Sequence, residues 1–148
     1  MKEYPYRKMN EMREILEVLQ MPSKLKNTRT ILTLLAVARV KEKSKWSQVE
    51  ESYARTHDMI VFMNEYYPNK GGTDLKRGGY SENSRETIRD DSVSPLCSMA
   101  VMEHNGAKSQ SEKSSYRLTK EFATLLRAYG TENWEEELCY YCETQDRK

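Results

Sequence analysis

The sequence predicts a mainly α-helical domain with one small β-hairpin, and three observations support this prediction. Apolar residues recur at spacings of three and four along much of the 148-residue chain, which is the pattern of helices that bury one face. Pro and Gly residues interrupt this pattern between the periodic segments. Asn105-Gly106, a dipeptide typical of hairpin turns, lies between two short apolar segments. The length fits a single domain with one modest core.

Three helices are expected in the first half of the chain. A helix over residues 8–20 carries its apolar residues on one stripe, and Pro22 ends it. Residues 23–39 form the most apolar segment, so a second helix there is expected to occupy the centre of the core. Trp46 follows a charged connector and is expected to be buried. A third amphipathic helix is expected over residues 53–67.

A helix of different character is expected after a loop. Residues 69–79 hold four of the six Gly residues and show no apolar periodicity, which predicts a basic loop. Asn83 is followed three residues later by Glu86, which is the spacing of a capping box. The fourth helix, over residues 84–93, has few aliphatic residues, and Pro95 limits its length.

The rest of the chain predicts the hairpin and two more helices. Residues 99–102 and 116–118 offer the two short strands, and residues 107–115 between them form a polar loop. Thr119 is expected to cap a fifth helix and Thr131 a sixth, each with apolar residues on one face.

The charge is balanced overall but unevenly distributed. The chain has 24 Lys and Arg and 23 Asp and Glu residues, which gives a net charge of +1. Residues 1–48 carry 11 basic and 5 acidic residues, whereas residues 119–148 carry 4 and 7. A basic region attracts polyanions, but the same charges are also typical of an ordinary solvated surface.

The composition indicates a cytoplasmic protein. The longest uncharged apolar-rich stretch, residues 30–38, is far shorter than the ~20 residues that a membrane-spanning helix needs. Charged residues throughout residues 1–20 exclude the apolar core of a secretory signal peptide. Three Cys, an odd number, argue against a secreted domain built on disulfides.

The order of elements after residue 53 is that of a winged helix-turn-helix: helix, loop, polar helix and hairpin. The sequence therefore predicts a winged helix-turn-helix core over about residues 53–118. Flanking helices are expected over about residues 8–40 and 119–142, with no sign of a second domain in residues 1–148. In such a fold the second helix enters the DNA major groove, and the hairpin touches the flanking backbone.

Arg85 and Arg89 stand four residues apart on the polar helix and therefore share a face. Their guanidinium groups would reach guanine edges or phosphates, and Asn83 would reach an adenine or the backbone at the start of the helix. The alternative interpretation of the same residues is a surface helix with ordinary charges at i and i+4.

Three segments of the chain together resemble the amino-terminal helical domain of BsuBI/PstI-type restriction endonucleases. They are NTRTILTLLA at residues 27–36, YSENSRETIR at residues 80–89 and YGT at residues 129–131. The resemblance covers about residues 12–141. It implies a winged-helix DNA-recognition domain of a type II restriction system, with double-stranded DNA as the partner and a CTGCAG-like palindrome as the site.

The resemblance also implies which residues contact DNA. Asn83, Arg85, Thr87 and Arg89 match the recognition-helix motif by position, and Asn27 and Arg29 match the motif at the start of the second helix. With Ser84 at the start of the polar helix and Lys108 in the wing, the candidate DNA-binding set is Asn27, Arg29, Asn83, Ser84, Arg85, Thr87, Arg89 and Lys108. The chain departs from the family at Asp90-Asp91, where a second basic residue is usual and where two acids would repel phosphate.

We expect the chain by itself not to cut DNA. Cleavage in the family is expected from a carboxy-terminal nuclease domain, in which acidic residues bind Mg²⁺ and a Lys assists the attacking water. The sequence holds no such constellation, so no catalytic residue and no cofactor are predicted for this chain, and Mg²⁺ is expected only for the missing nuclease domain. Cys97, Cys139, Cys142 and His104 could form a Cys₃His set, but their spacing is not that of a zinc site, so no metal is predicted.

Three functional classes remain open at this point. The first is the recognition domain of a restriction enzyme. The second is a winged-helix regulator or restriction-control protein that binds DNA as a homodimer through the tail helix with Trp134, Tyr140 and Tyr141. The third is a winged helix that binds protein, which Asp90-Asp91 would favour. Steep salt dependence separates the first two from the third, and half-site spacing separates the second from the first.

Overall fold

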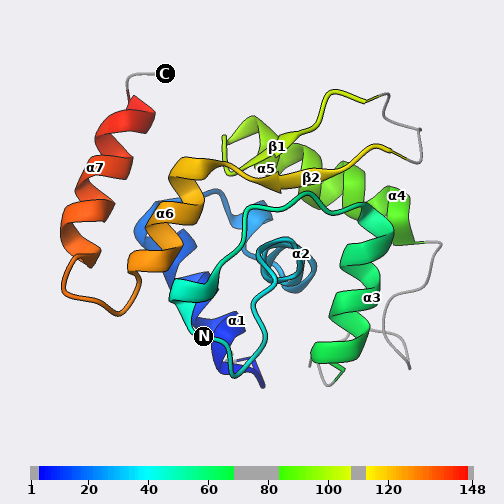
Figure 1. Ribbon diagram of the computed structural model, residues 1–148, viewed down its shortest axis with the longest axis horizontal. Coiled ribbons are helices and arrows are strands. Elements are labelled where there is room, and N and C mark those ends of the chain that lie inside the picture. Colours follow the sequence, from blue (N-terminus) through cyan, green and yellow to red (C-terminus); the bar gives the residue numbers. More distant parts are fainter. Residues whose placement is uncertain (1–3, 69–83, 108–112, 147–148) are drawn as a thin grey trace.

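The computed structural model describes residues 4–68, 84–107 and 113–146 of the chain. Most of these residues are helical, and a two-stranded antiparallel hairpin is the sheet that they contain, as the sequence predicts. The elements are α1 (Arg7–Val18), α2 (Thr28–Ala38), α3 (Thr56–Tyr66), α4 (Arg85–Ile88), α5 (Ser94–Ser98), β1 (Met102–His104), β2 (Tyr116–Leu118), α6 (Lys120–Ala128) and α7 (Trp134–Asp146). Figure 1 shows α2 end-on in the middle of the molecule, with α3 on one side and α6 and α7 on the other.

Helix α2 forms the centre of the core, as its apolar sequence predicts. Every residue from position 30 to position 38 is buried, and α2 contacts α1, α3, α4 and β2. The two threonines on this helix are compatible with burial because their hydroxyls are bonded: that of Thr33 donates to the carbonyl of Arg29 at 2.8 Å, and that of Thr30 lies 2.9 Å from the hydroxyl of Ser92.

The helix begins later than the sequence predicts. Residues Ser23–Leu25 form a short 3₁₀ turn after Pro22, and α2 starts only at Thr28. The reason is local, because the side chain of Asn27 accepts a hydrogen bond from the backbone N–H of Thr30 at 2.8 Å and so caps the helix. Trp46 is 7% exposed, which confirms its predicted burial.

An isolated antiparallel bridge connects the segment before α3 to the hairpin. It pairs Ala54 with Tyr116 of β2. From this bridge the chain continues through α3, α4 with α5, β1 and β2, which is the order of helices and hairpin that the sequence predicts.

The polar helix is longer than predicted. It runs through a π-helical turn at Arg89–Val93 into α5, so residues 85–98 form one continuous helical segment. Pro95 was expected to limit this helix, and that prediction is wrong. It occupies the first turn of α5, and the wider π turn before it accommodates the ring and the missing N–H.

The hairpin forms, but its first strand lies later than predicted. Strand β1 occupies Met102–His104 instead of residues 99–102, whereas β2 occupies the predicted residues 116–118. Strands β1 and β2 pair with Met102 opposite Leu118 and His104 opposite Tyr116. Gly106 adopts a φ of +87°, which glycine reaches without strain, at the turn signalled by Asn105-Gly106.

The last two helices follow the hairpin as expected, with one difference at a cap. Thr119 accepts a hydrogen bond from the N–H of Phe122 at 3.3 Å and caps α6 as predicted. Thr131 lies in the preceding turn instead of at the cap of α7, which begins at Trp134. In the described part of the chain, no helix is both long and apolar enough to cross a membrane.

Candidate nucleic-acid interface

The helical segment over residues 85–98 is held by one face and presents the other to solvent. Ile88, Val93 and Leu96 are fully buried in the core. Arg85 and Thr87 are exposed. The buried apolar residues thus anchor the helix that the sequence predicted for DNA contact, while these two polar side chains stay at the surface.

The second arginine of this face is paired with its neighbour. The Nε atom of Arg89 lies 3.0 Å from Oδ1 of Asp90, and the Arg89 side chain is 29% exposed. The hydrogen bond that Arg89 donates to Asp90 raises the pKa of Arg89 above its usual value, so the guanidinium stays charged. Asp91 is also exposed, which places two carboxylates on the surface next to the candidate arginines.

The start of α2 lies against the same helix. The Nε atom of Arg29 donates to the hydroxyl of Ser92 at 3.1 Å, and the same hydroxyl lies 2.9 Å from that of Thr30. The fold therefore brings together the two sequence motifs that carry Arg29 and Arg89, although they are about 60 residues apart. Ser92 is fully buried, so this small network joins α2 to the π turn inside the protein.

Two further candidates lie at helix starts. The amide of Asn27 accepts from the N–H of Thr30 and donates to the carbonyl of Lys24 at 2.9 Å, so the polar atoms of this side chain have bonds within the protein. Ser84 is half-buried at the N-cap position of α4. Asn83, with the capping box that it predicts, and Lys108 lie outside the described residues.

The wing carries a positively charged residue that was not among those predicted to bind DNA. Arg117 on β2 pairs through Nε with Glu103 on β1 at 2.7 Å, and its guanidinium lies 4.6 Å from the ring centre of Tyr53. The hydrogen bond that Arg117 donates to Glu103 raises the pKa of Arg117. Tyr116 and Leu118, on either side of Arg117, are buried. Since alternate residues of a strand face opposite sides, the sequence could have placed Arg117 on the outer face of the wing.

The cysteines and the wing histidine do not gather into a site. Cys97 is half-buried and burial raises the pKa of its thiol, whereas Cys139 and Cys142 are exposed on α7. The Nε2 atom of His104 lies 2.7 Å from the hydroxyl of Ser114 within the wing. Within residues 4–68, 84–107 and 113–146, no group of three or more His, Cys, Asp or Glu side chains is placed to hold a metal ion.

Two restriction enzymes are similar to this chain. The type II restriction enzyme BsuBI of Bacillus subtilis is 27% identical over 132 residues, which cover 86% of this chain and 39% of that enzyme. The structure of the SdaI restriction endonuclease superposes with a TM-score of 0.77 at 22% identity, covering 91% of this chain and 41% of that one. The chain thus spans about two fifths of the length of each relative.

The family comparison covers nearly the whole chain. The model of the BsuBI/PstI restriction endonuclease HTH domain matches residues 6–147. This range includes α1 to α7, and with them the capped start of α2, the polar helix and the wing. The chain therefore belongs to the BsuBI/PstI restriction endonuclease HTH domain family.

Proposed function

We propose that this chain is the DNA-recognition part of a type II restriction enzyme and that it binds double-stranded DNA through the helical segment at residues 85–98 and the wing. The observation that carries the proposal is the exposure of Arg85 and Thr87 on a helix that Ile88, Val93 and Leu96 anchor in the core. An anchored helix with exposed guanidinium and hydroxyl groups has the arrangement that reads bases in a major groove.

The start of α2 extends the same interface. Arg29 is tied through Nε to Ser92, so its guanidinium is held beside the recognition helix. A guanidinium has five N–H donors, so one bond to Ser92 leaves donors for a phosphate. In this proposal Arg29 positions the backbone, and Arg85 contacts base edges, as phosphate and base contacts divide in other complexes.

Cleavage is proposed to need residues beyond those of this chain. The family model that matches residues 6–147 describes a helix-turn-helix domain, and the described residues hold no cluster of metal-binding side chains. We therefore propose that this chain alone is not catalytic and that Mg²⁺ is used by a separate nuclease domain. The recognised sequence in this proposal is a CTGCAG-like palindrome.

A protein-binding winged helix is the second candidate, and Asp90 and Asp91 favour it. Both carboxylates are exposed on the recognition helix, where they oppose the approach of phosphate. If the face binds protein instead, affinity for DNA will be weak and will not depend on its sequence.

The test is the fluorescence anisotropy of labelled duplexes titrated with the protein. One duplex carries CTGCAG and the other the same bases in scrambled order, and both are measured at several salt concentrations with Mg²⁺ present. The proposal expects tighter binding to CTGCAG, a linear fall of log affinity with log salt concentration, and intact DNA on a gel. Absence of binding to either duplex would support the protein-binding candidate, and cut DNA would contradict the non-catalytic proposal.

The same experiment separates a recognition domain from a dimeric regulator. A homodimeric regulator would bind best to two half-sites whose centres lie about one helical turn apart. A duplex series with increasing half-site spacing, combined with light scattering of the complex, distinguishes the two. A recognition domain is expected to give the same affinity at every spacing.

A further inference from the structure

A groove that is open to solvent lies between α2 and α3. Its volume is about 560 Å³. Arg39, the C-cap of α2, lines it together with residues of α3 and of the segment before α3. Arg29 lies near the other end of α2, so at 1.5 Å per helical residue the two arginines are ~15 Å apart along the helix. None of the residues that line the groove belongs to the proposed DNA interface.

Arg39 has no carboxylate partner within the described residues. Most of the described arginines form an ion pair with Asp or Glu: Arg7, Arg13, Arg55, Arg89, Arg117 and Arg127. The half-buried guanidinium of Arg39 instead forms one hydrogen bond, from Nη2 to the backbone carbonyl of Tyr53 at 3.3 Å. Because removing a charge from water is costly unless the charge is paired, this arginine indicates a missing anion.

The nitrogens of this guanidinium differ in access. The Nε atom is enclosed and has no partner in the part of the chain that the structure describes, so a ligand does not reach it. The Nη1 atom is also without a hydrogen bond there, but, unlike Nε, it is not enclosed. Nη2 uses one of its two N–H groups for Tyr53. Nη1 and Nη2 therefore offer a fork of two donors, which matches the two oxygens of one carboxylate.

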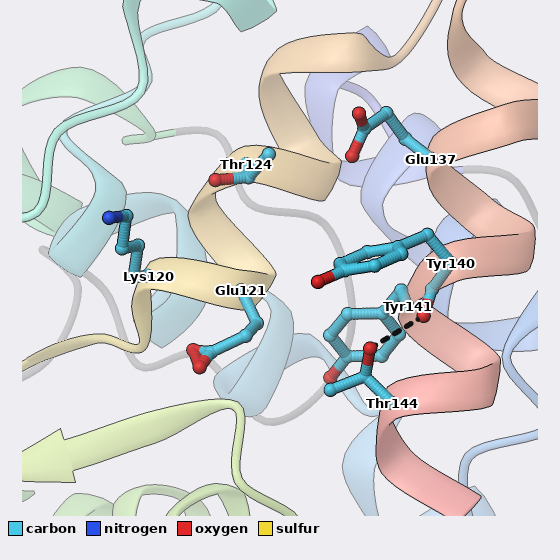
Figure 2. A pocket seen from close by; sticks show the side chains of 7 residues that line it. All are labelled: Lys120, Glu121, Thr124, Glu137, Tyr140, Tyr141 and Thr144. Atoms are coloured by element: carbon cyan, nitrogen blue, oxygen red, sulfur yellow. Dashed lines mark hydrogen bonds between the residues drawn. The ribbon is translucent and has the colours of Figure 1, made fainter.

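The charged side chains of another cavity differ from Arg39 in their exposure. That cavity lies between α6 and α7, and Figure 2 shows the residues that line it. Its Lys120 and Glu121 are exposed, so water already solvates their charges. A surface charge needs no partner, whereas the half-buried charge of Arg39 does.

The backbone of Arg39 is left-handed, with a φ of +60°. Glycine adopts this conformation at helix ends without strain, whereas a residue with a Cβ atom does not. Gln20 and Ala100 have the same conformation at the ends of other helices, so the backbone alone does not indicate a ligand. It makes glycine a well-tolerated substitute, and the effect of losing the Arg39 side chain can therefore be tested without adding backbone strain.

The remaining surface of the groove is partly apolar. Ala36 and Ala54 line it and are each 2% exposed, and their small side chains leave space above them. The rings of Phe62 and Tyr66 line it from α3, with their centres 4.7 Å apart. Val61, next to them on α3, is 48% exposed. An apolar group bound beside Arg39 would cover this surface.

The acidic residues of the groove limit the charge of the anion. Asp58 is already paired with Arg55, with Oδ1 and Nη2 3.3 Å apart. Glu65 is exposed and does not pair with Arg39. Neither carboxylate neutralises Arg39, but both repel a ligand with two negative charges. One unpaired cation therefore favours an anion with a single charge.

We propose that the groove between α2 and α3 binds a monoanionic carboxylate that is attached to an apolar group. The carboxylate accepts hydrogen bonds from Nη1 and Nη2 of Arg39, and the apolar group covers Ala36, Ala54 and Phe62. An uncharged apolar ligand would leave the guanidinium without its anion. The site is separate from the proposed DNA interface, so either proposal can fail without the other.

The test is a titration of the full-length, ¹⁵N-labelled protein with phenylacetate, followed by ¹H–¹⁵N NMR spectra. Saturable shifts are expected at the backbone amides of Arg39, Ala54 and Phe62. Phenylacetamide is the matched neutral probe and should cause no saturable shift. Phenyl phosphate, a dianion, should bind more weakly than phenylacetate. N-acetyl-phenylalanine in a parallel titration distinguishes a peptide carboxyl terminus, which would bind more tightly than phenylacetate, from a free aryl acid.

Variants assign the binding to Arg39. Arg39→Gln should weaken binding about tenfold or more, because it removes the charge from the two hydrogen bonds. Arg7→Gln is the matched control, since it removes an arginine that is 80% exposed on α1 and does not line the groove. This control should bind phenylacetate with unchanged affinity.

A glycine pair separates binding from a structural role of the side chain. Arg39→Gly should abolish binding, while the free protein unfolds at the same or a higher urea concentration, because glycine fits the left-handed backbone. Gln20→Gly makes the same backbone change at an exposed position outside the groove and should leave binding intact.

Four outcomes would overturn the proposal. Equal shifts with phenylacetamide would show that charge is not recognised, and tighter binding of phenyl phosphate would assign the groove to phosphate. Equal losses of affinity in Arg7→Gln and Arg39→Gln would show unspecific attraction to positive charge. Unfolding of Arg39→Gly at a lower urea concentration than the unchanged protein would show that this arginine stabilises the fold instead of awaiting a ligand.

Discussion

At the scale of single residues, Arg85 and Arg89 differ although the sequence places them on one face. Arg85 is exposed at the start of the helix, whereas Arg89 is 29% exposed and paired with Asp90 at 3.0 Å. The pairing means that Arg89 must exchange a carboxylate for a phosphate or a base before it can contact DNA.

Arg85→Ala is predicted to weaken binding to the preferred duplex by about 1–3 kcal/mol if this guanidinium contacts a base in bidentate fashion. The measurement is anisotropy with the preferred and scrambled duplexes. Arg7→Ala is the control, because Arg7 is a highly exposed arginine on α1, outside the proposed interface. An equal loss on both duplexes would assign Arg85 to phosphate contact.

Asp90→Asn is predicted to strengthen DNA binding. The change removes a charge that opposes phosphate, and it weakens the hydrogen bond that Nε of Arg89 donates, because an amide oxygen is a poorer acceptor than a carboxylate. We expect several-fold higher affinity at low salt, with the gain shrinking as ionic strength rises, because the effect is electrostatic. Unchanged affinity across the salt series would mean that this part of the helix does not approach DNA.

At the scale of elements, the cap of α2 separates a structural role of Asn27 from a DNA-contacting one. Asn27→Ala is predicted to lower the free energy of unfolding by about 1 kcal/mol, the usual effect of losing an N-cap. Asn27→Ser should preserve the cap and most of the stability, as measured by urea denaturation. If Asn27→Ser nevertheless weakens DNA binding, the amide itself contacts DNA.

The buried network between α2 and the π turn predicts a second stability effect. Ser92→Ala leaves the hydroxyl of Thr30 and the Nε atom of Arg29 without this partner, so we expect a loss of about 1–3 kcal/mol. A double-mutant cycle with Thr30→Val should show coupling, since the two hydroxyls are 2.9 Å apart. Additive losses would mean that the hydroxyls contribute independently.

At the scale of the whole molecule, α2 joins the parts of the chain. It contacts α1, α3, α4 and β2. A substitution that leaves a cavity beside α2 should therefore destabilise all of these elements. Leu34→Ala, at a fully buried position, is predicted to cost about 2–5 kcal/mol of unfolding free energy. Far-UV circular dichroism and Trp fluorescence should report one shared, lower transition. Two separate transitions would show that the elements around α2 unfold independently.

The features that sequence reasoning predicted correctly depend on neighbours along the chain. The cap at Thr119 and the positive φ of Gly106 each need only a few adjacent residues. The amphipathic stripes of α1, α3 and α6 likewise follow from local spacing, and the family resemblance rests on contiguous segments. Such features can be predicted from the sequence, because the residues that form the pattern also form the contacts that stabilise it.

Tertiary structure decided what depends on residues far apart. The bridge from Ala54 to Tyr116 connects the segment before α3 to the hairpin, and the contact of Arg29 with Ser92 joins α2 to the π turn. The continuation of the helix through Pro95 depends on the π turn before it, and Tyr141 is buried where α7 packs on α6. The sequence by itself therefore determined the helices, the hairpin and the family, because these arise from local periodicity and turn chemistry. Which polar groups meet and which remain unpartnered was decided by packing, since long-range contacts leave no local pattern.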